Sequence, residues 1–510
     1  MVSVGIDFGT TNSILAYFED DRPRVHIPST GAGAPQIRSA VVLSNQDARA
    51  TIGSAALLKR RRGGVRLIDR FKLKIGLVSE AEVAAKTFLD TMIDNFKADR
   101  GVPDIESLVI TVPDQWLREG GQVSYQSLIR ICASLRLPIK KVLSEPVSAV
   151  SYVSYELAKA GTPFSGHALV YDHGGGTLDL SLVRVDNTQI TTIDGGGVGP
   201  GETAPGVGGV DYDAAVLAHL KKLGAVARDL DATAQADWLA TFEECKISLG
   251  GEIDDALTAY LDFERADDLD QPIFDVHGAD IRPSTLVTVF DAAIAPPIEK
   301  EIAAFRSKHA QIVGHDAVRI VMVGGFSNFC LVRRLVERTF ECSGPADPRF
   351  QTGLGKTGRS FAVALGACLY AADETRIFES CPVDLAIWML DENRQRVLVP
   401  LLRRGQPISE DGTPHFPDIG IVAPDRAGLH TTRLQLVINH GANEKELTTE
   451  FSAADAMPNL DRAARWRIGA LVDEKLCAHI VFETDDHERA RQKMSIGDLM
   501  VRNRNRTKLQ

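Results

Sequence analysis

The chain has 510 residues, of which 44% are hydrophobic and 25% charged, as in a soluble globular protein of about three domains. Its formal net charge of −11 argues against a nucleic-acid binder and favours a cytoplasmic protein. The 7 cysteines include no Cys-x-x-Cys pair, so neither a disulfide framework nor a zinc site is indicated. No stretch approaches the roughly 18 apolar residues that span a membrane, and we expect no signal peptide.

The chain opens with an apolar strand, Val4–Ile6, followed by a turn rich in glycine and threonine and by a second apolar strand. Asp7 ends the first strand, and the next residues of the turn include Gly9, Thr10, Thr11 and Asn12. Backbone amides of such a turn can converge on a phosphate group, and a carboxylate beside them can hold hydrated Mg²⁺. The pattern predicts a phosphate-binding hairpin.

A second copy of this pattern occupies Asp172–Asp179, between two apolar runs. Asp172 and Asp179 supply carboxylates, and the turn residues are Gly174, Gly175, Gly176 and Thr177. Glycines leave no side chain in the way of a ligand and reach positive φ without steric cost. Taken alone, the octapeptide also fits an ordinary glycine-rich hairpin. Two copies, each opening half of a long region, predict a duplicated fold that binds a nucleotide between its halves.

Between the two hairpins, residues 39 to 104 read as an insertion, with a strand at 40–43 and a helix at about 80–97. The insertion contains a basic segment with two lysines, Lys72 and Lys74, which in isolation would be ordinary solvated side chains. A buried strand at 107–113 and a helix at about 121–135 follow. Glu145 then precedes Pro146, and both residue types are favoured at the start of a helix.

After the second hairpin, residues 194–209 are dense in glycine and predict a flexible loop that ends in Gly208-Gly209. Helices are expected at 214–222, 242–249, 330–339 and 360–371. Glu243 and Lys246 lie one turn apart on the second of these, where surface ion pairing is the simplest explanation. A buried strand at 318–323 meets Gly324-Gly325, a geometry in which backbone can approach a ligand.

From Pro382 onward, the pattern changes to alternating strands separated by turns. The clearest strands are at 385–390, 396–401, 434–438 and 477–482, and a further strand includes 493–496. A separate β domain is therefore predicted for this part of the chain.

The motifs, in this order, resemble those of the seventy-kilodalton heat-shock (DnaK-type) chaperone family of the actin-like ATPase superfamily. The resemblance implies an α/β actin-like ATPase domain of two duplicated lobes, each with a mixed sheet, over residues 1–375. Insertion subdomains are expected at about 39–104 and 210–285. A short linker at 376–382 would lead to a β-sandwich at 383–510 that resembles a peptide-binding domain and has no helical lid.

The resemblance also assigns roles to individual residues. Lys72, with Lys74 as the fallback, corresponds to the lysine that reaches the γ-phosphate, and Glu145 to the glutamate that faces the attacking water. Asp7 and Asp172 would hold Mg²⁺ through water, with Thr177 near the attacking water. Nucleotide contacts would come from both turns and from Gly208, Gly209, Glu243, Lys246, Gly324 and Gly325.

The function implied is that of a weak ATPase that uses ATP/ADP and Mg²⁺ and binds a peptide or protein client, with co-chaperones as further partners. An alternative is a nucleotide-gated, actin-like scaffold or filament with little chaperone activity. A small-molecule kinase of the same superfamily is a third hypothesis, and the C-terminal β domain argues against it.

Four positions depart from the family pattern around the nucleotide base. Ile247 and Asn328 stand where arginines are common, Phe326 replaces a serine, and Ser360 replaces an acidic residue. We therefore expect micromolar or weaker ATP affinity and poor discrimination against GTP, unless the ring of Phe326 stacks on the base. The linker is also shorter and less leucine-rich than in the family, which weakens the expectation that nucleotide state is transmitted to the β domain.

Overall fold

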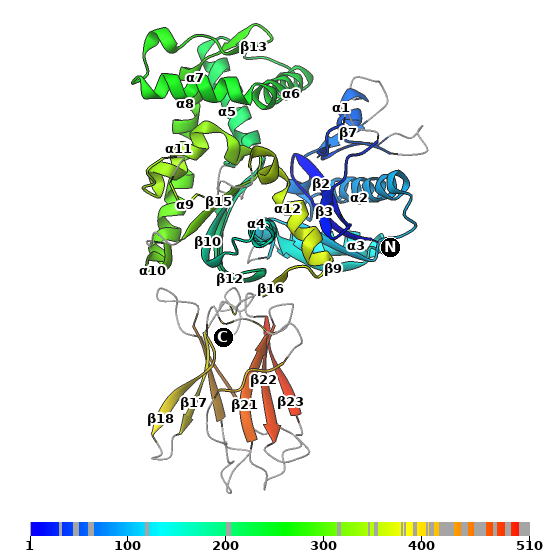
Figure 1. The fold of residues 1–510 in the computed structure, drawn as a ribbon, viewed down its shortest axis with the longest axis vertical. Helices are drawn as coiled ribbons and strands as arrows, with labels where there is room; N and C mark the ends of the chain where they lie inside the picture. Colours follow the sequence, from blue (N-terminus) through cyan, green and yellow to red (C-terminus); the bar gives the residue numbers. More distant parts are fainter. Residues whose placement is uncertain are drawn as a thin grey trace. The chain divides into compact units, whose positions relative to one another are not determined.

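The computed structural model contains two compact units, which are described separately (Figure 1). Met1–Ile190 and Gly195–Arg376 form the first unit, and Thr191–Asp194 and Ile377–Gln510 form the second. The described residues are 2–29, 33–43, 50–59, 66–117, 122–199, 206–313, 318–344, 347–350, 355–378, 381, 384–390, 395–403, 406, 408, 413–417, 433–439, 447–452, 466–472, 477–484 and 491–498.

The first unit contains two mixed sheets that share one pairing pattern. One sheet has the order β3 (Arg22–Val25), β2 (Asn12–Glu19), β1 (Ser3–Asp7), β8 (Ser107–Val112) and β9 (Ile139–Ser144), with β4 (Ile37–Arg38) beside β2. The other includes, in order, β15 (Arg319–Val323), β10 (Ser165–His173), β11 (Leu178–Asp186) and β12 (Gln189–Val198). β1 and β10 are each antiparallel to the next strand in the chain and parallel to β8 and β15, respectively. The repeat confirms the predicted duplicated fold.

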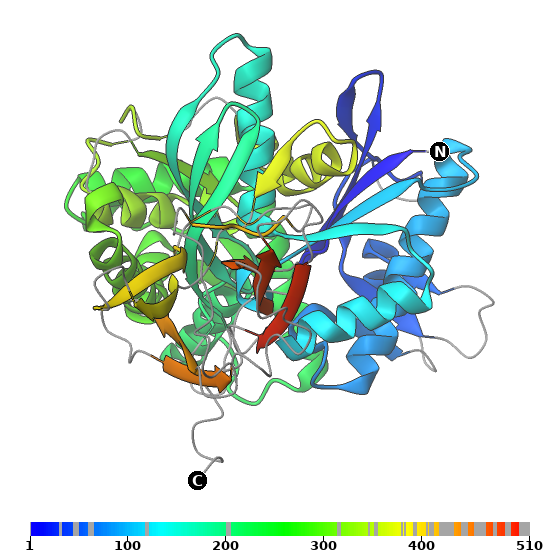
Figure 2. The ribbon, with the colours of Figure 1, turned by 90° about the horizontal axis from the view of Figure 1, so that it is seen from below.

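A pair of closely packed helices, α4 (Glu145–Lys159) and α12 (Gly355–Ala371), connects the two sheets (Figures 1 and 2). α12 packs on β1 and β2, whereas α4 packs on β10 and β11. Gly366 allows the close approach, because a Cβ there would lie 1.7 Å from the carbonyl oxygen of Ser148. The Ser148 hydroxyl donates to the carbonyl of Val363 at 2.8 Å. A small residue on α12 thus serves close packing against α4.

The first insertion forms a small sheet flanked by helices. Its strand order is β6 (Thr51–Ile52), β5 (Ala40–Leu43) and β7 (Arg66–Asp69), with α1 (Ser54–Lys59), η1 (Phe71–Lys74) and α2 (Ser79–Arg100). η2 (Asp114–Leu117) and α3 (Gln122–Ser134) follow β8. Phe71 and Phe88 are fully buried and pack together on Phe8, which anchors η1 to the first sheet. α2 and α3 confirm the two expected helices.

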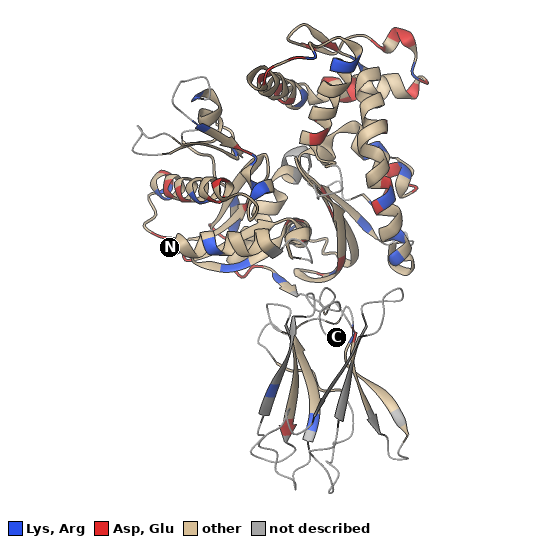
Figure 3. Ribbon diagram, turned by 180° about the vertical axis from the view of Figure 1, so that it is seen from behind, with Lys and Arg blue, Asp and Glu red and all other residues tan. Residues whose placement is uncertain are grey.

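The second insertion is mainly helical. It contains α5 (Gly209–Leu223), α6 (Ala232–Ser248), α7 (Gly250–Asp262), η3 (Asp267–Leu269), the hairpin β13 (Phe274–Val276) and β14 (Ala279–Ile281), and α8 (Pro283–Val289). The π-helical turn η4 (Phe290–Ile294), α9 (Ala295–Lys308), α10 (Ala310–Val313), η5 (Phe326–Asn328) and α11 (Cys330–Thr339) complete the unit. The end of α7 and the segment after it carry the exposed acidic residues Asp262, Glu264, Asp267 and Asp268, and acidic positions are coloured red along the ribbon in Figure 3.

The prediction of a flexible loop over residues 194–209 is wrong at its beginning, because β12 continues to Val198. A Cβ at Gly197 would lie 2.4 Å from the carbonyl oxygen of Leu178. Glycine at this position allows a neighbouring strand to approach closely. The prediction was wrong because glycine is also typical of flexible loops. Residues 200–205 lie outside the described residues.

The second unit contains two antiparallel sheets. The first has the order β18 (Arg396–Leu402), β17 (Asp384–Leu390), β19 (Arg433–Asn439) and β20 (Leu447–Ser452), and the second β21 (Trp466–Val472), β22 (Cys477–Thr484) and β23 (Arg491–Asp498). Leu385, Ile387, Ile480 and Phe482 are buried in its core. All of the expected strands are present. β16 (Arg376–Phe378) begins the predicted linker, of which residues 379, 380 and 382 lie outside the described residues.

Candidate functional site

The two predicted phosphate turns lie in direct contact. A Cβ on Gly175 would lie 2.2 Å from the hydroxyl oxygen of Thr11, and one on Gly176 would lie 3.2 Å from the Thr10 side chain. This contact meets the geometric requirement for two turns that would share one triphosphate. The Thr11 hydroxyl is buried and has no hydrogen-bond partner among the described residues. A polar ligand at this place would supply one.

Serines that the sequence analysis did not single out hold the first turn. The Gly9 amide donates to the Ser13 hydroxyl at 3.2 Å, and the Ser39 hydroxyl donates to the Gly9 carbonyl at 2.7 Å. A Cβ at Gly9 would lie 1.9 Å from the Asn12 carbonyl oxygen, so only glycine fits. In the second turn, the Gly174 amide donates to the Thr177 carbonyl at 3.1 Å. Both turns are thus tight and fixed by short-range hydrogen bonds.

Lys72 is the lysine that reaches the site. Its side chain is only 2% exposed, forms an ion pair with the Glu145 carboxylate, and lies 5.8 Å and 5.7 Å from the ring centroids of Phe8 and Trp116. Lys74, the fallback, is exposed. Glu145 begins α4, as a helix-start residue would, and still directs its side chain to Lys72. Its position confirms the helix-start reading, and its carboxylate lies beside Lys72.

Four carboxylates surround this lysine. Burial, and then the Glu145 charge, raise the pKa of Asp7 to about 7, although Lys72 partly offsets the rise. Burial also raises the pKa of Asp172 well above its usual range, with Glu145, Asp179 and Asp7 adding to the effect. The pKa of Asp179 rises to about 8 because of burial, Glu145 and Asp114. The nearby Thr177 hydroxyl offsets only part of this last rise.

This electrostatic arrangement fits a hydrated divalent cation. One lysine cannot neutralise four carboxylates, of which Asp172 and Asp179 are buried, and neither oxygen of Asp179 has a hydrogen bond of regular geometry among the described residues. Magnesium prefers carboxylate oxygen and water as ligands and would relieve the repulsion. Asp7 and Asp172 are the carboxylates that the sequence assigned to this ion. Asp179 belongs to the predicted second hairpin but was assigned no role, and Asp114, which follows a strand and carries no motif, was not predicted.

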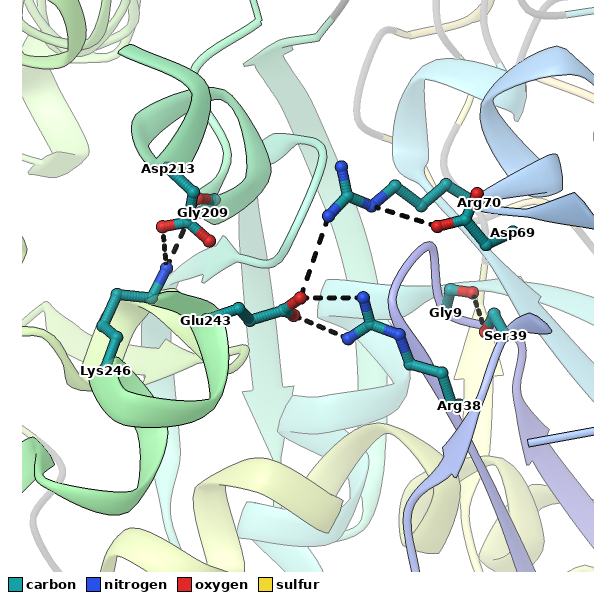
Figure 4. Close-up of polar contacts among 9 residues, drawn as sticks. All are labelled: Gly9, Arg38, Ser39, Asp69, Arg70, Gly209, Asp213, Glu243 and Lys246. Carbon is teal, nitrogen blue, oxygen red and sulfur yellow. Dashed lines mark hydrogen bonds and ion pairs between the residues drawn. The ribbon is translucent and has the colours of Figure 1, made fainter. Parts of the chain in front are cut away.

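Glu243 and Lys246 both lie on α6, and each already has protein partners (Figure 4). The Arg38 guanidinium donates to both Glu243 oxygens at 2.6 and 2.7 Å, and an Arg70 nitrogen lies 3.8 Å from the same carboxylate. Lys246 forms an ion pair with Asp213. The arginines come from the first half of the unit and Glu243 from the second, so the contact spans the two halves.

The pKa values of the Glu243 and Asp213 carboxyl groups reflect these ion pairs. Despite burial, hydrogen bonding and the charge of Arg38 hold the pKa of Glu243 below its usual range. Burial raises the pKa of Asp213 to about 6, with Lys246 opposing the rise. The Lys246 ammonium also lies 3.4 Å from the Gly209 carbonyl oxygen, which it can reach as a donor. Lys246 therefore connects α6 to the glycine pair that begins α5.

Gly324 and Gly325 end β15 beside the second hairpin. A Cβ at Gly324 would lie 2.5 Å from an Asp172 carboxylate oxygen, so this backbone packs on the site, whereas Gly325 has open space around it. Phe326 is buried against Phe329, with ring centroids 5.5 Å apart and planes 14° apart. The Phe326 ring therefore belongs to the core in this structure, and stacking on a base would require it to move. Ile247 is 65% exposed.

The paired mixed sheets and the two touching phosphate turns define an actin-like ATPase fold. A family model described as Hsp70 protein matches residues 77–372, more than half of the chain. The chain belongs to the Hsp70 family. Similar relatives include the chaperone protein HscA homolog of Variovorax paradoxus, 28% identical over 374 residues that cover 66% of this chain and 54% of the relative.

The HscA homolog of Colwellia psychrerythraea is 26% identical over 402 residues, which cover 72% of this chain and 58% of the relative. The chain therefore spans little more than half the length of the curated relatives it matches. Among the described residues, no helix is both long and apolar enough to cross a membrane.

Proposed function

We propose that the first unit binds Mg²⁺–ATP between its two glycine turns and hydrolyses it slowly. The observation that carries the proposal is the buried Lys72, which pairs with Glu145 among Asp7, Asp172 and Asp179 next to two touching phosphate turns. Family membership supports it independently.

Attack by water on a γ-phosphate depends on positioning and charge neutralisation. Amides and hydroxyls of the turns bind phosphate oxygens, and Lys72 supplies positive charge toward the γ-phosphate. Glu145 orients the attacking water, with Asp172 and Thr177 nearby. Asp7 and Asp172 would hold Mg²⁺ through water, and the ion would supply positive charge to the phosphates.

The remaining predicted residues bind the nucleoside. Gly208, Gly209, Gly324 and Gly325 provide backbone against the ribose and base. Lys246 and Glu243 bind the ribose, and Glu243 must then share its carboxylate with Arg38. Since Ile247 and Asn328 supply no cation for the base, we propose that adenine is held more weakly than the phosphates.

Turnover by single-site variants tests this mechanism. Removing one preorganised charge from a phosphoryl-transfer site costs about 10²–10³ in rate. We therefore expect Lys72→Ala, Glu145→Gln and Asp172→Asn each to lower steady-state phosphate release by that factor without unfolding the protein. Lys74→Ala is the matched control and should retain wild-type turnover. Wild-type turnover by Lys72→Ala would contradict the proposal.

We further propose that the protein is chaperone-like and that the second unit binds an extended peptide or protein client. Its antiparallel sheets and the names of the HscA relatives support this assignment. Fluorescence anisotropy with labelled unfolded peptides, in ATP and in ADP, measures both binding and its dependence on nucleotide. Absence of peptide binding, together with nucleotide-dependent and concentration-dependent sedimentation, would favour the scaffold hypothesis.

A further inference from the structure

His173 lies inside the second phosphate motif, and the proposed mechanism gives it no role. Its side chain is fully buried. Nε2 lies 2.9 Å from the carbonyl oxygen of Val207, and Nδ1 lies 3.2 Å from the Tyr171 hydroxyl oxygen. Because a carbonyl oxygen can only accept, Nε2 must carry the hydrogen, and Nδ1 accepts from the Tyr171 hydroxyl. Both ring nitrogens are thus used.

Val207 belongs to the short segment 206–209 that precedes α5. Beyond Val207, two backbone hydrogen bonds fasten the chain to the hairpin: the Gly209 amide donates to the Gly174 carbonyl at 3.1 Å, and the Val210 amide to the Gly175 carbonyl at 2.9 Å. A Cβ at Gly208 would lie 2.3 Å from the Gly175 carbonyl oxygen. The segment therefore lies directly on the phosphate turn, and His173 provides a side-chain hydrogen bond to it.

The imidazole also contacts the segment that follows β15. The His173 and Phe326 rings meet edge to face, with centroids 4.9 Å apart and planes 73° apart. A Cβ at Gly324 would lie 2.6 Å from the His173 carbonyl oxygen. His173 thus lies where three segments meet: the phosphate turn, the glycine pair that Lys246 contacts, and the segment expected beside the base.

We propose that His173 is a positioning residue for nucleotide binding. Its Nε2–H fixes the Val207–Gly209 backbone on the phosphate turn, which sets the spacing between the phosphate site and Lys246. This inference rests on the proposed ATP-binding function. The competing explanation is that the ring merely fills the core. The two differ in what they require: positioning needs the hydrogen-bond donor, whereas core filling needs only a ring of similar size.

A pair of substitutions separates these explanations. His173→Phe keeps an aromatic ring and removes the donor, while His173→Gln keeps an N–H donor near the position of Nε2 and removes the ring. Hydrogen exchange of the Gly209 and Val210 amides, measured without nucleotide, reports whether the segment is fixed. Calorimetric titration of ATP reports the consequence for binding. His167→Gln, on the same strand but only half-buried, is the matched control.

We expect His173→Phe to speed exchange at both amides about tenfold and to weaken ATP binding about tenfold, the effect of losing one buried hydrogen bond. His173→Gln should recover most of both losses, and His167→Gln should behave as wild type. If His173→Phe does not fold, Tyr171→Phe still removes the hydroxyl that holds Nδ1, and it should weaken ATP binding two- to threefold.

Two results would overturn the inference while leaving the proposed function intact: unchanged exchange and ATP affinity in His173→Phe, or equal impairment of His173→Gln and His173→Phe. An unchanged ATP affinity in Tyr171→Phe would do the same when it is the usable variant. If the wild-type protein binds no ATP, the proposed function fails, and the nucleotide-positioning role fails with it.

Discussion

Replacing Asp179 by asparagine removes a buried charge that the protein leaves poorly compensated. The side chain is buried, neither oxygen has a regular hydrogen bond, and the pKa is raised from 3.8 to about 8 by burial, Glu145 and Asp114. Because the folded-state pKa lies above the unfolded-state pKa, the unfolded chain releases this proton first as the pH rises. The contribution to stability is fully present below about pH 4 and is lost as the pH rises to about 8.

The size of the effect follows from proton linkage. Each pH unit between the two pKa values is worth about 1.4 kcal/mol for one proton, so the whole window has an upper bound of about 6 kcal/mol. The neighbouring carboxylates share this repulsion, and side chains relax. We therefore expect Asp179→Asn to raise the free energy of unfolding by about 1–3 kcal/mol at pH 8 and by under about 0.5 kcal/mol at pH 4.5.

Urea titration of the nucleotide-free protein at pH 4.5, 6.5 and 8 measures this difference. Trp116, which lies beside Lys72, provides a fluorescence signal close to the site. Asp268→Asn, a substitution of an exposed carboxylate, is the matched control and should show no pH-dependent gain. If Asp179→Asn is no more stable than wild type at pH 8, or if its gain is the same at every pH, the carboxylate cluster is not electrostatically strained.

The other predictions concern nucleotide binding. Arg38→Ala removes the bidentate pair with Glu243 and should speed release of a fluorescent ADP analogue about tenfold in stopped flow. Arg70→Ala should have a smaller effect, because the Arg70 nitrogen lies 3.8 Å from the Glu243 carboxylate. Equal release rates for wild type and Arg38→Ala would show that the Arg38–Glu243 pair does not restrain the nucleotide. Gly175→Ala places a Cβ 2.2 Å from the Thr11 hydroxyl oxygen and should abolish ATP binding in calorimetry. Gly174→Ala should weaken ATP binding less, because a Cβ at that position would have no atom within 4 Å. Without arginines at positions 247 and 328, ATP should bind with micromolar or weaker affinity and GTP within about tenfold of it; nanomolar, adenine-selective binding would show that other residues recognise the base.

Local sequence patterns were sufficient for the duplicated hairpins, for the strands β8 and β15 beside them, and for helices such as α2, α3, α5, α11 and α12. A glycine turn between two apolar runs depends on neighbouring residues only, so Gly9–Asn12 and Gly174–Thr177 were recognisable without a structure. The glycines at 195–197 were misleading, because glycine is favoured both in loops and where strands approach closely, and a single sequence does not distinguish the two.

Tertiary structure alone decided which distant side chains meet. Lys72 and Lys74 are two residues apart in the same basic segment, yet the conformation of η1 buries the first and exposes the second. Arg38 and Glu243 are separated by 205 positions, and nothing in either local pattern indicates their ion pair. Phe326 is buried not only by nearby Phe329 but also by the rings of His173 and Tyr212, which come from distant segments. These contacts depend on how the two halves of the unit pack, which no local spacing records.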